Sequence, residues 1–113
     1  MRIYTDRNGV TVEALNTLRV SGWPDGHSYQ VNHGGAVVAI EFQRGPVKDF
    51  GLNGLSTEAL LAICHHRLSV LNQGQFRCFQ NAKAIASIAD ALAQLEGRAR
   101  ERELRGVAGT SQA

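Results

Sequence analysis

Three arginines near the end of the chain recur at the spacing of a single helix face. Arg98, Arg102 and Arg105 lie within the segment EGRARERELR, three or four residues apart. Residues at this spacing are neighbours on the surface of an α-helix. Each guanidinium group offers a planar fork of N–H donors that fits a phosphate with two hydrogen bonds. The pattern therefore predicts a site for a compact anionic ligand.

The same segment also has a purely structural interpretation. Glu96 with Arg100, and Glu101 with Arg105, are spaced four residues apart. Such ion pairs stabilise an exposed helix by about 0.2–0.5 kcal/mol each. On the residues alone, both interpretations stay open.

Other reactive side chains lack the arrangement that catalysis or metal binding requires. Cys64, His65 and His66 are consecutive, so a helix directs them to three different sides, and a shared metal ion is disfavoured. No serine lies in a nucleophile elbow, no carboxylate pair is set apart from the surface charges, and NHGGAVV lacks the spacing of a phosphate loop. We therefore expect no catalytic residue, no metal ion and no cofactor.

Aromatic and amide groups near residue 76 allow two interpretations each. Phe76 and Phe79 either pack in a helical core or offer a stacking surface for a base. Asn81 either hydrogen-bonds the edge of a base or caps the start of a helix.

The elements that carry these residues follow from the periodicity after Gly51. Ser56 is a suitable N-cap, and the apolar residues after it recur at helical spacing for about 16 residues. A second helical pattern runs for about 26 residues and ends at Gly106, a residue type that commonly terminates helices. The short turn between them predicts an antiparallel helical hairpin.

Residues 1–48 have the alternating pattern of strands. YQVN and AVVAIEFQ each place apolar residues on one face, and His33-Gly34-Gly35 between them favours a tight hairpin turn. DRNG separates two shorter strands, SGWPDG with Trp23 forms a loop, and TVEALNTLRV either continues a strand or contains a helical turn. We expect an α+β protein, with a small antiparallel β domain at 1–50 and a helical hairpin at 51–113.

The unequal lengths of the two helices predict self-association. The first helix covers only part of the second, yet the apolar stripe continues through Leu92 and Leu95. A lone helix end of this kind is not stable without packing. A second copy of the chain is therefore expected to cover it, which places the arginine row beside a groove between subunits.

Composition excludes several function classes. The chain has 113 residues and a formal net charge of +2, which is too small for the broad basic face of a duplex-binding protein. No apolar run has the length of a membrane span, and the polar N-terminal residues do not resemble a signal peptide. Cys64 and Cys78, the only cysteines, are expected to be buried and reduced in an intracellular protein.

Residues 40–110 resemble the helical-hairpin domain shared by two families of phage anti-defence proteins. These are the anti-Thoeris sponges, which sequester glycocyclic ADP-ribose signals, and the anti-CBASS sponges, which sequester cyclic oligonucleotides. The resemblance rests on GPVK at 45–48, NG at 53–54, EALLAI at 58–63, on Phe76, Cys78 and Asn81, and on the tail from Arg98 to Thr110. The strand-rich first half is similar to the anti-Thoeris branch.

The resemblance implies a function and a set of binding residues. Such proteins form dimers and hexamer-like oligomers in the cytoplasm of the infected bacterial host, bind cyclic ADP-ribose isomers between subunits, in some cases also cyclic trinucleotides, and cleave nothing. By position, Arg98 and Arg102 would hold the phosphates, Asn81 would hydrogen-bond the ligand, and Leu71 and Phe76 would contact the adenine. The residues that complete the implied site are Arg105, Gly109 and Thr110.

Three function classes remain. The first is a sponge that sequesters a nucleotide signal. The second is a protein-interaction module that inhibits a host protein through its β domain, with Trp23 as a candidate contact. The third is a small enzyme that turns over a nucleotide, which the missing catalytic groups disfavour.

Overall fold

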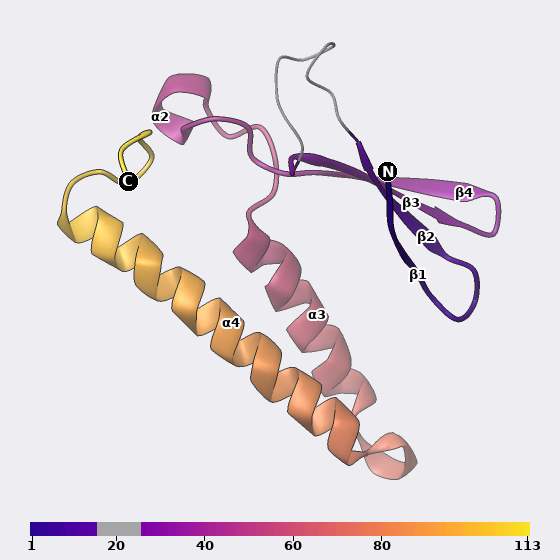
Figure 1. Ribbon diagram of the computed structural model, residues 1–113. Coiled ribbons are helices and arrows are strands. Elements are labelled where there is room, and N and C mark those ends of the chain that lie inside the picture. Colours follow the sequence, from indigo (N-terminus) through magenta and orange to yellow (C-terminus); the bar gives the residue numbers. More distant parts are fainter. Residues whose placement is uncertain (16–25) are drawn as a thin grey trace. The chain divides into compact units, whose positions relative to one another are not determined.

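The structure is a computed structural model that describes residues 1–15 and 26–113 (Figure 1). These residues form two compact units, Met1–Leu55 and Ser56–Ala113. The predicted loop around Trp23 lies outside the described residues. The first unit is a β-sheet and the second a helical hairpin, which confirms the predicted α+β class.

The first unit contains a four-stranded antiparallel sheet in the order β1-β2-β3-β4. Its strands are β1 (Arg2–Thr5), β2 (Thr11–Leu15), β3 (Ser28–His33) and β4 (Ala36–Glu41). Gly34 and Gly35 have φ angles of 51° and 84°, the left-handed values that a two-residue hairpin turn needs. The described part of TVEALNTLRV is strand, not a helical turn.

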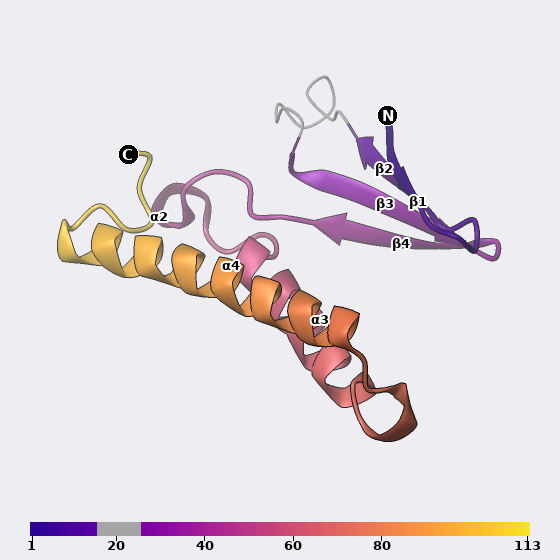
Figure 2. The same ribbon diagram turned by 60° about the horizontal axis from the view of Figure 1, so that its bottom comes forward.

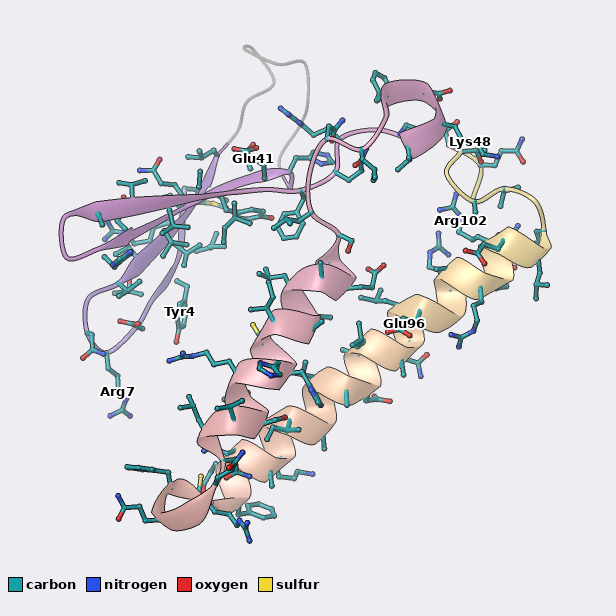
Figure 3. The ribbon with its side chains drawn as sticks, turned by 180° about the vertical axis from the view of Figure 1, so that it is seen from behind. Tyr4, Arg7, Glu41, Lys48, Glu96 and Arg102 are labelled. Carbon is teal, nitrogen blue, oxygen red and sulfur yellow. The ribbon has the colours of Figure 1, made fainter. Side chains whose placement is uncertain are left out.

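The register of the sheet separates an apolar face from a polar face. Val12, Val31 and Val38 are cross-strand partners in adjacent pairs, and Tyr4 lies opposite Val12. Residues directly opposite in an antiparallel pair share a face. Figure 3 shows Tyr4 and Glu41 projecting from opposite sides of the sheet.

The chain then passes through a loop that carries the short helix α2 (Val47–Phe50). Leu55 forms an isolated parallel bridge with Phe42, so residues 51–55 group with the sheet. The side chain of Gln43 donates to the carbonyl oxygens of Gly45 and Gly51, at 3.2 and 2.8 Å. These bonds link the two ends of the loop.

The second unit is the predicted hairpin of α3 (Thr57–Leu71) and α4 (Phe79–Leu104), joined by the 3₁₀ turn η1 (Gly74–Phe76). Ser56 caps α3, because its side chain accepts a hydrogen bond from the Ala59 amide at 3.0 Å. The N-cap of α4 is Cys78, whose sulfur accepts from the Asn81 amide at 3.4 Å, so the alternative in which Asn81 caps the helix is wrong. Gly106 follows the helix with a φ of 74°.

The two helices differ greatly in length. α3 has 15 residues and α4 has 26, and Figure 1 shows α4 extending well beyond α3. Ile88, Leu92 and Leu95 are half-buried on the face of α4 that continues the core stripe. At helical spacing this stripe proceeds to Ala99 and Arg102, where α3 no longer covers it.

Burial within one chain is slight. Across the described ranges no hydrophobic residue is buried, and Ser28, at 2% exposure, is the buried polar residue. Cys64 and Cys78 are both exposed and free, so the expectation of buried thiols is wrong. Cys64 lies within α3, and Cys78 lies directly before α4. The same ranges contain no helix both long enough and apolar enough to cross a lipid bilayer.

Candidate functional site

Arg102 holds the C-terminal segment against the end of α4. Its Nη2 atom donates to the carbonyl oxygens of Val107, Thr110 and Gln112, at 3.2, 3.0 and 2.7 Å. Hydrogen bonds from a charged donor are about twice as strong as those between neutral groups. Figure 3 shows Arg102 beside the C-terminal loop, and Figure 2 shows this segment turning back along α4.

Arg105 forms a second contact with the same segment. Its Nη2 atom donates to the main-chain oxygen of Ala113 at 2.6 Å, and its guanidinium forms an ion pair with Glu101. The structural interpretation of the Glu101–Arg105 pair is therefore confirmed. The other expected pair, Glu96 with Arg100, makes no ion pair within the described part of the chain.

Arg98 differs from both. It is exposed and forms neither a hydrogen bond nor an ion pair with any residue in the described ranges. Its guanidinium therefore keeps its donors for a ligand or a second chain. Of the three arginines, Arg98 is the one whose guanidinium binds no other residue in the described part of its own chain.

Gly109 and Thr110 belong to the segment that Arg102 holds. Gly109 has a φ of 73°, a left-handed value that glycine adopts without strain. The Thr110 amide donates to the Val107 carbonyl at 3.1 Å, and its hydroxyl donates to the same oxygen. The structure thus brings four of the expected site residues together around the end of α4: Arg102, Arg105, Gly109 and Thr110.

The remaining expected residues lie at the opposite end of the hairpin. Leu71 is 46% exposed at the end of α3, and Phe76 is 70% exposed in the connecting turn. Phe79 is 73% exposed, so within one chain the alternative that places the two phenylalanines in the hairpin core is wrong. Asn81 is half-buried in the first turn of α4.

The separation between the two groups exceeds the size of one small ligand. Asn81 and Arg98 lie on the same helix, about 25 Å apart at 1.5 Å per residue. Arg102 is farther still, about 31 Å from Asn81. A single chain therefore cannot close all of these residues around one nucleotide.

An open, mostly apolar hollow lies along the outer face of α3. Its lining residues are Ala62, Ile63, His66, Arg67, Val70 and Leu71. It includes one expected site residue, Leu71, and one of the paired histidines. The described residues contain no group of three or more His, Cys, Asp or Glu side chains that could hold a metal ion.

Two features were missed from the sequence. The Cys78 cap escapes attention because thiols are weak acceptors, and Ser, Thr, Asn and Asp are the usual N-caps. The carbonyl cluster around Arg102 has a local signal in Gly106 and Gly109, whose positive φ angles reverse the chain over the helix end. The two glycines predict a turn, but they do not show that the Arg102 side chain binds the carbonyl oxygens of that turn.

Comparison with known proteins gives one informative similarity. No protein-family model matches the chain. The chain is 42% identical over 76 residues to a protein called Thoeris anti-defense 1 from the Bacillus phage SBSphiJ7. The matched region is 67% of this chain and 54% of that relative, so the chain spans about half the length of the curated protein it matches.

Proposed function

We propose that this chain is a phage anti-defence protein that acts against the Thoeris system inside the infected bacterial host. The 42% identity to Thoeris anti-defense 1 supports this role. The proposed activity is to bind glycocyclic ADP-ribose signals and keep them from their effector without cleaving them. The observation that carries the ligand class is the free, exposed guanidinium of Arg98, since its planar fork of donors suits a phosphate group.

The proposed site forms between two copies of the chain. When two long helices pack antiparallel, residues equidistant from their crossing point lie opposite each other. The midpoint between Asn81 and Arg98 along α4 falls beside Asp90. An antiparallel pair of α4 helices centred there brings the base-contacting end of one chain to the arginine end of the other.

Uncovered apolar surface supports this assembly. Phe76 and Phe79 are 70% and 73% exposed in one chain, and Leu104 is 89% exposed. Exposed apolar groups of this size mark interaction sites when they cluster. A second copy also covers the end of the α4 stripe, where Ala99 allows a close approach because its side chain is small.

Each group in the composite site has a chemical role. Phe76 offers an aromatic face on which adenine stacks, and Leu71 offers an apolar contact for the same base. Asn81 supplies one amide donor and one acceptor for the base or ribose. Arg98 binds the phosphates, Arg102 and Arg105 add positive charge beside it, and Gly109 and Thr110 form the rim. Cyclic trinucleotides share the phosphate and adenine chemistry and are a second ligand class to test.

A protein-interaction function remains the alternative. The observation in its favour is the apolar face of the sheet, on which Tyr4 is 61% exposed and Val38 45% exposed. In this alternative the β domain binds a host protein, and the helical hairpin only assembles the chains. Changes on the sheet then remove activity, whereas changes at Arg98 do not.

Calorimetry with a ligand panel tests the proposal. The panel contains the two glycocyclic ADP-ribose isomers, cyclic ADP-ribose, and several cyclic di- and trinucleotides. We expect submicromolar binding of one glycocyclic isomer, at one ligand per chain, with intact ligand recovered by mass spectrometry. Turnover of the ligand points to an enzyme, and silence across the panel in a confirmed oligomer favours the protein-interaction alternative.

A further inference from the structure

The C-terminal segment Val107–Ala113 is fastened to α4 by arginine side chains. Arg102 Nη2 donates to three carbonyl oxygens of this segment, within 3.2 Å in each case. Arg105 Nη2 contacts a fourth main-chain oxygen, that of Ala113. The Val107 amide also donates to the Arg102 carbonyl at 3.0 Å. Arg102 therefore binds the segment through both its side chain and its main chain.

The hydrogen bonds from Arg102 to this segment limit what else its guanidinium can bind. An Nη atom carries two hydrogens, so three carbonyl oxygens already share all the donors of Nη2. The Nε atom is buried and has no hydrogen-bond partner in the structure. Direct contact of Arg102 with a ligand is therefore restricted to Nη1, the guanidinium nitrogen that is neither buried nor hydrogen-bonded. Arg98, in contrast, is exposed and lies one helical turn away, about 6 Å along the axis.

We propose that Arg102 is a positioning residue, which acts on the ligand through the segment Val107–Ala113. It holds this segment against the last turn of α4, where the segment forms one wall of the anion site. Arg98 supplies the free guanidinium of that site. The ligand half of this inference rests on the proposed function, whereas the fastening of the segment does not.

The first experiment needs no ligand. Hydrogen–deuterium exchange is measured on the full chain, on Arg102→Ala and on the matched control Arg98→Ala. In Arg102→Ala we expect exchange at the Val107 and Thr110 amides to accelerate at least tenfold, because the turn that protects them loses its anchor. In Arg98→Ala these amides should exchange as in the parent protein. Equal exchange in all three proteins overturns the fastening role.

The second experiment separates positioning from direct contact. The probe is a glycocyclic ADP-ribose isomer, titrated into four proteins: the parent chain, Arg102→Ala, a chain that ends at Gly106, and the combination of the two changes. Positioning predicts that Arg102→Ala weakens binding at least tenfold in the full chain and less than twofold in the shortened chain, since the segment is already gone. An equal loss in both backgrounds overturns the inference in favour of direct contact.

Controls keep the two proposals distinguishable. Circular dichroism must show unchanged helix content in the shortened chain, and Arg102→Lys should restore only part of the exchange protection, since an ammonium lacks the planar fork. If the probe binds none of the four proteins, the proposed function and the ligand half of this inference fail together. The exchange result still decides whether Arg102 fastens the segment.

Discussion

The side-chain amide of Asn53 pairs with the main chain of Arg44 as a neighbouring strand would. Asn53 Oδ1 accepts from the Arg44 amide at 2.7 Å, and Asn53 Nδ2 donates to the Arg44 carbonyl at 2.8 Å. The Asn53 amide in turn donates to Gln43 Oε1 at 3.0 Å. Two side-chain amides thus take the place of a β-ladder and close the loop that carries α2.

This pairing predicts that Asn53→Asp destabilises the chain. The aspartate loses the donor to the Arg44 carbonyl and faces that oxygen with a negative charge, so a decrease of about 0.5–1.5 kcal/mol in the free energy of unfolding is expected at this exposed position. Urea denaturation of the parent and variant chains measures it. Gln75→Glu, at an exposed turn position, is the control, and an equal shift in both variants contradicts the pairing.

Gly54 and Gly97 predict opposite outcomes for the same substitution. A Cβ atom at Gly54 would lie 2.5 Å from the main-chain carbonyl carbon of Phe42, so Gly54→Ala should destabilise the chain by about 1–3 kcal/mol. At Gly97, inside α4, the nearest atom is 3.9 Å away, and Gly97→Ala should stabilise by about 0.5–1 kcal/mol. Thermal denaturation of the two variants side by side tests both signs.

Ser56 predicts a moderate effect at the start of α3. Ser56→Ala removes the acceptor of the Ala59 amide, which should cost about 1 kcal/mol, while Ser56→Asp should retain most of the stability because aspartate also caps helices. The midpoint of chemical denaturation reports the difference. Equal midpoints for the alanine and aspartate variants would show that the cap contributes nothing.

The combined substitution of Arg98 and Arg102 by alanine should abolish ligand binding. Arg98→Ala removes the charged hydrogen bonds to the phosphate, each of which contributes about 1.5–3 kcal/mol, and Arg102→Ala releases the segment beside them, so the double variant should weaken binding by several kcal/mol. Calorimetry measures the change, and light scattering must show an unchanged oligomer. Arg7→Ala, an exposed arginine in the turn before β2, is the matched control and should bind normally. Normal binding by the double variant would refute the pocket.

Substitution of Ala99 by glutamate should weaken self-association without affecting the hairpin. It is exposed in one chain and lies beyond the reach of α3, so Ala99→Glu leaves the hairpin intact but places a charge in the proposed interface. We expect the dissociation constant of the oligomer to rise at least about tenfold, since a buried unpaired charge costs well over 1.4 kcal/mol. Sedimentation velocity measures it, with the exposed Gln94→Glu as control. An unchanged oligomer would place the interface elsewhere.

The helical hairpin was predictable from local signals. Ser56 and Gly106 mark the first and last boundaries through capping chemistry that involves only neighbouring residues, and the apolar period between them is unambiguous. The strands followed from alternation and from the paired glycines of the β3–β4 turn. These features depend on interactions a few residues apart, which a sequence displays directly.

The loop after β4 and the partners of the arginines were not predictable. The Asn53–Arg44 bonds join residues nine positions apart and depend on how the chain returns, which no periodicity records. The spacing of Arg98, Arg102 and Arg105 predicts a common face, but it cannot say that Arg102 binds carbonyl oxygens while Arg98 stays free. That distinction arises from the turn at Gly106, which brings main-chain acceptors to Arg102 and Arg105 but not to Arg98.

The length of α4 sets how many ligands a pair of chains can hold and how they influence each other. In the proposed antiparallel pair, the symmetry that builds one site at one end of the helices builds an identical site at the other. About 25 Å of rigid helix then separates two equivalent anions, roughly three times the screening length at physiological salt. The charge bound at one end is therefore hardly felt at the other. Such a pair fills its two sites independently, with a hyperbolic rather than a sigmoidal uptake of ligand.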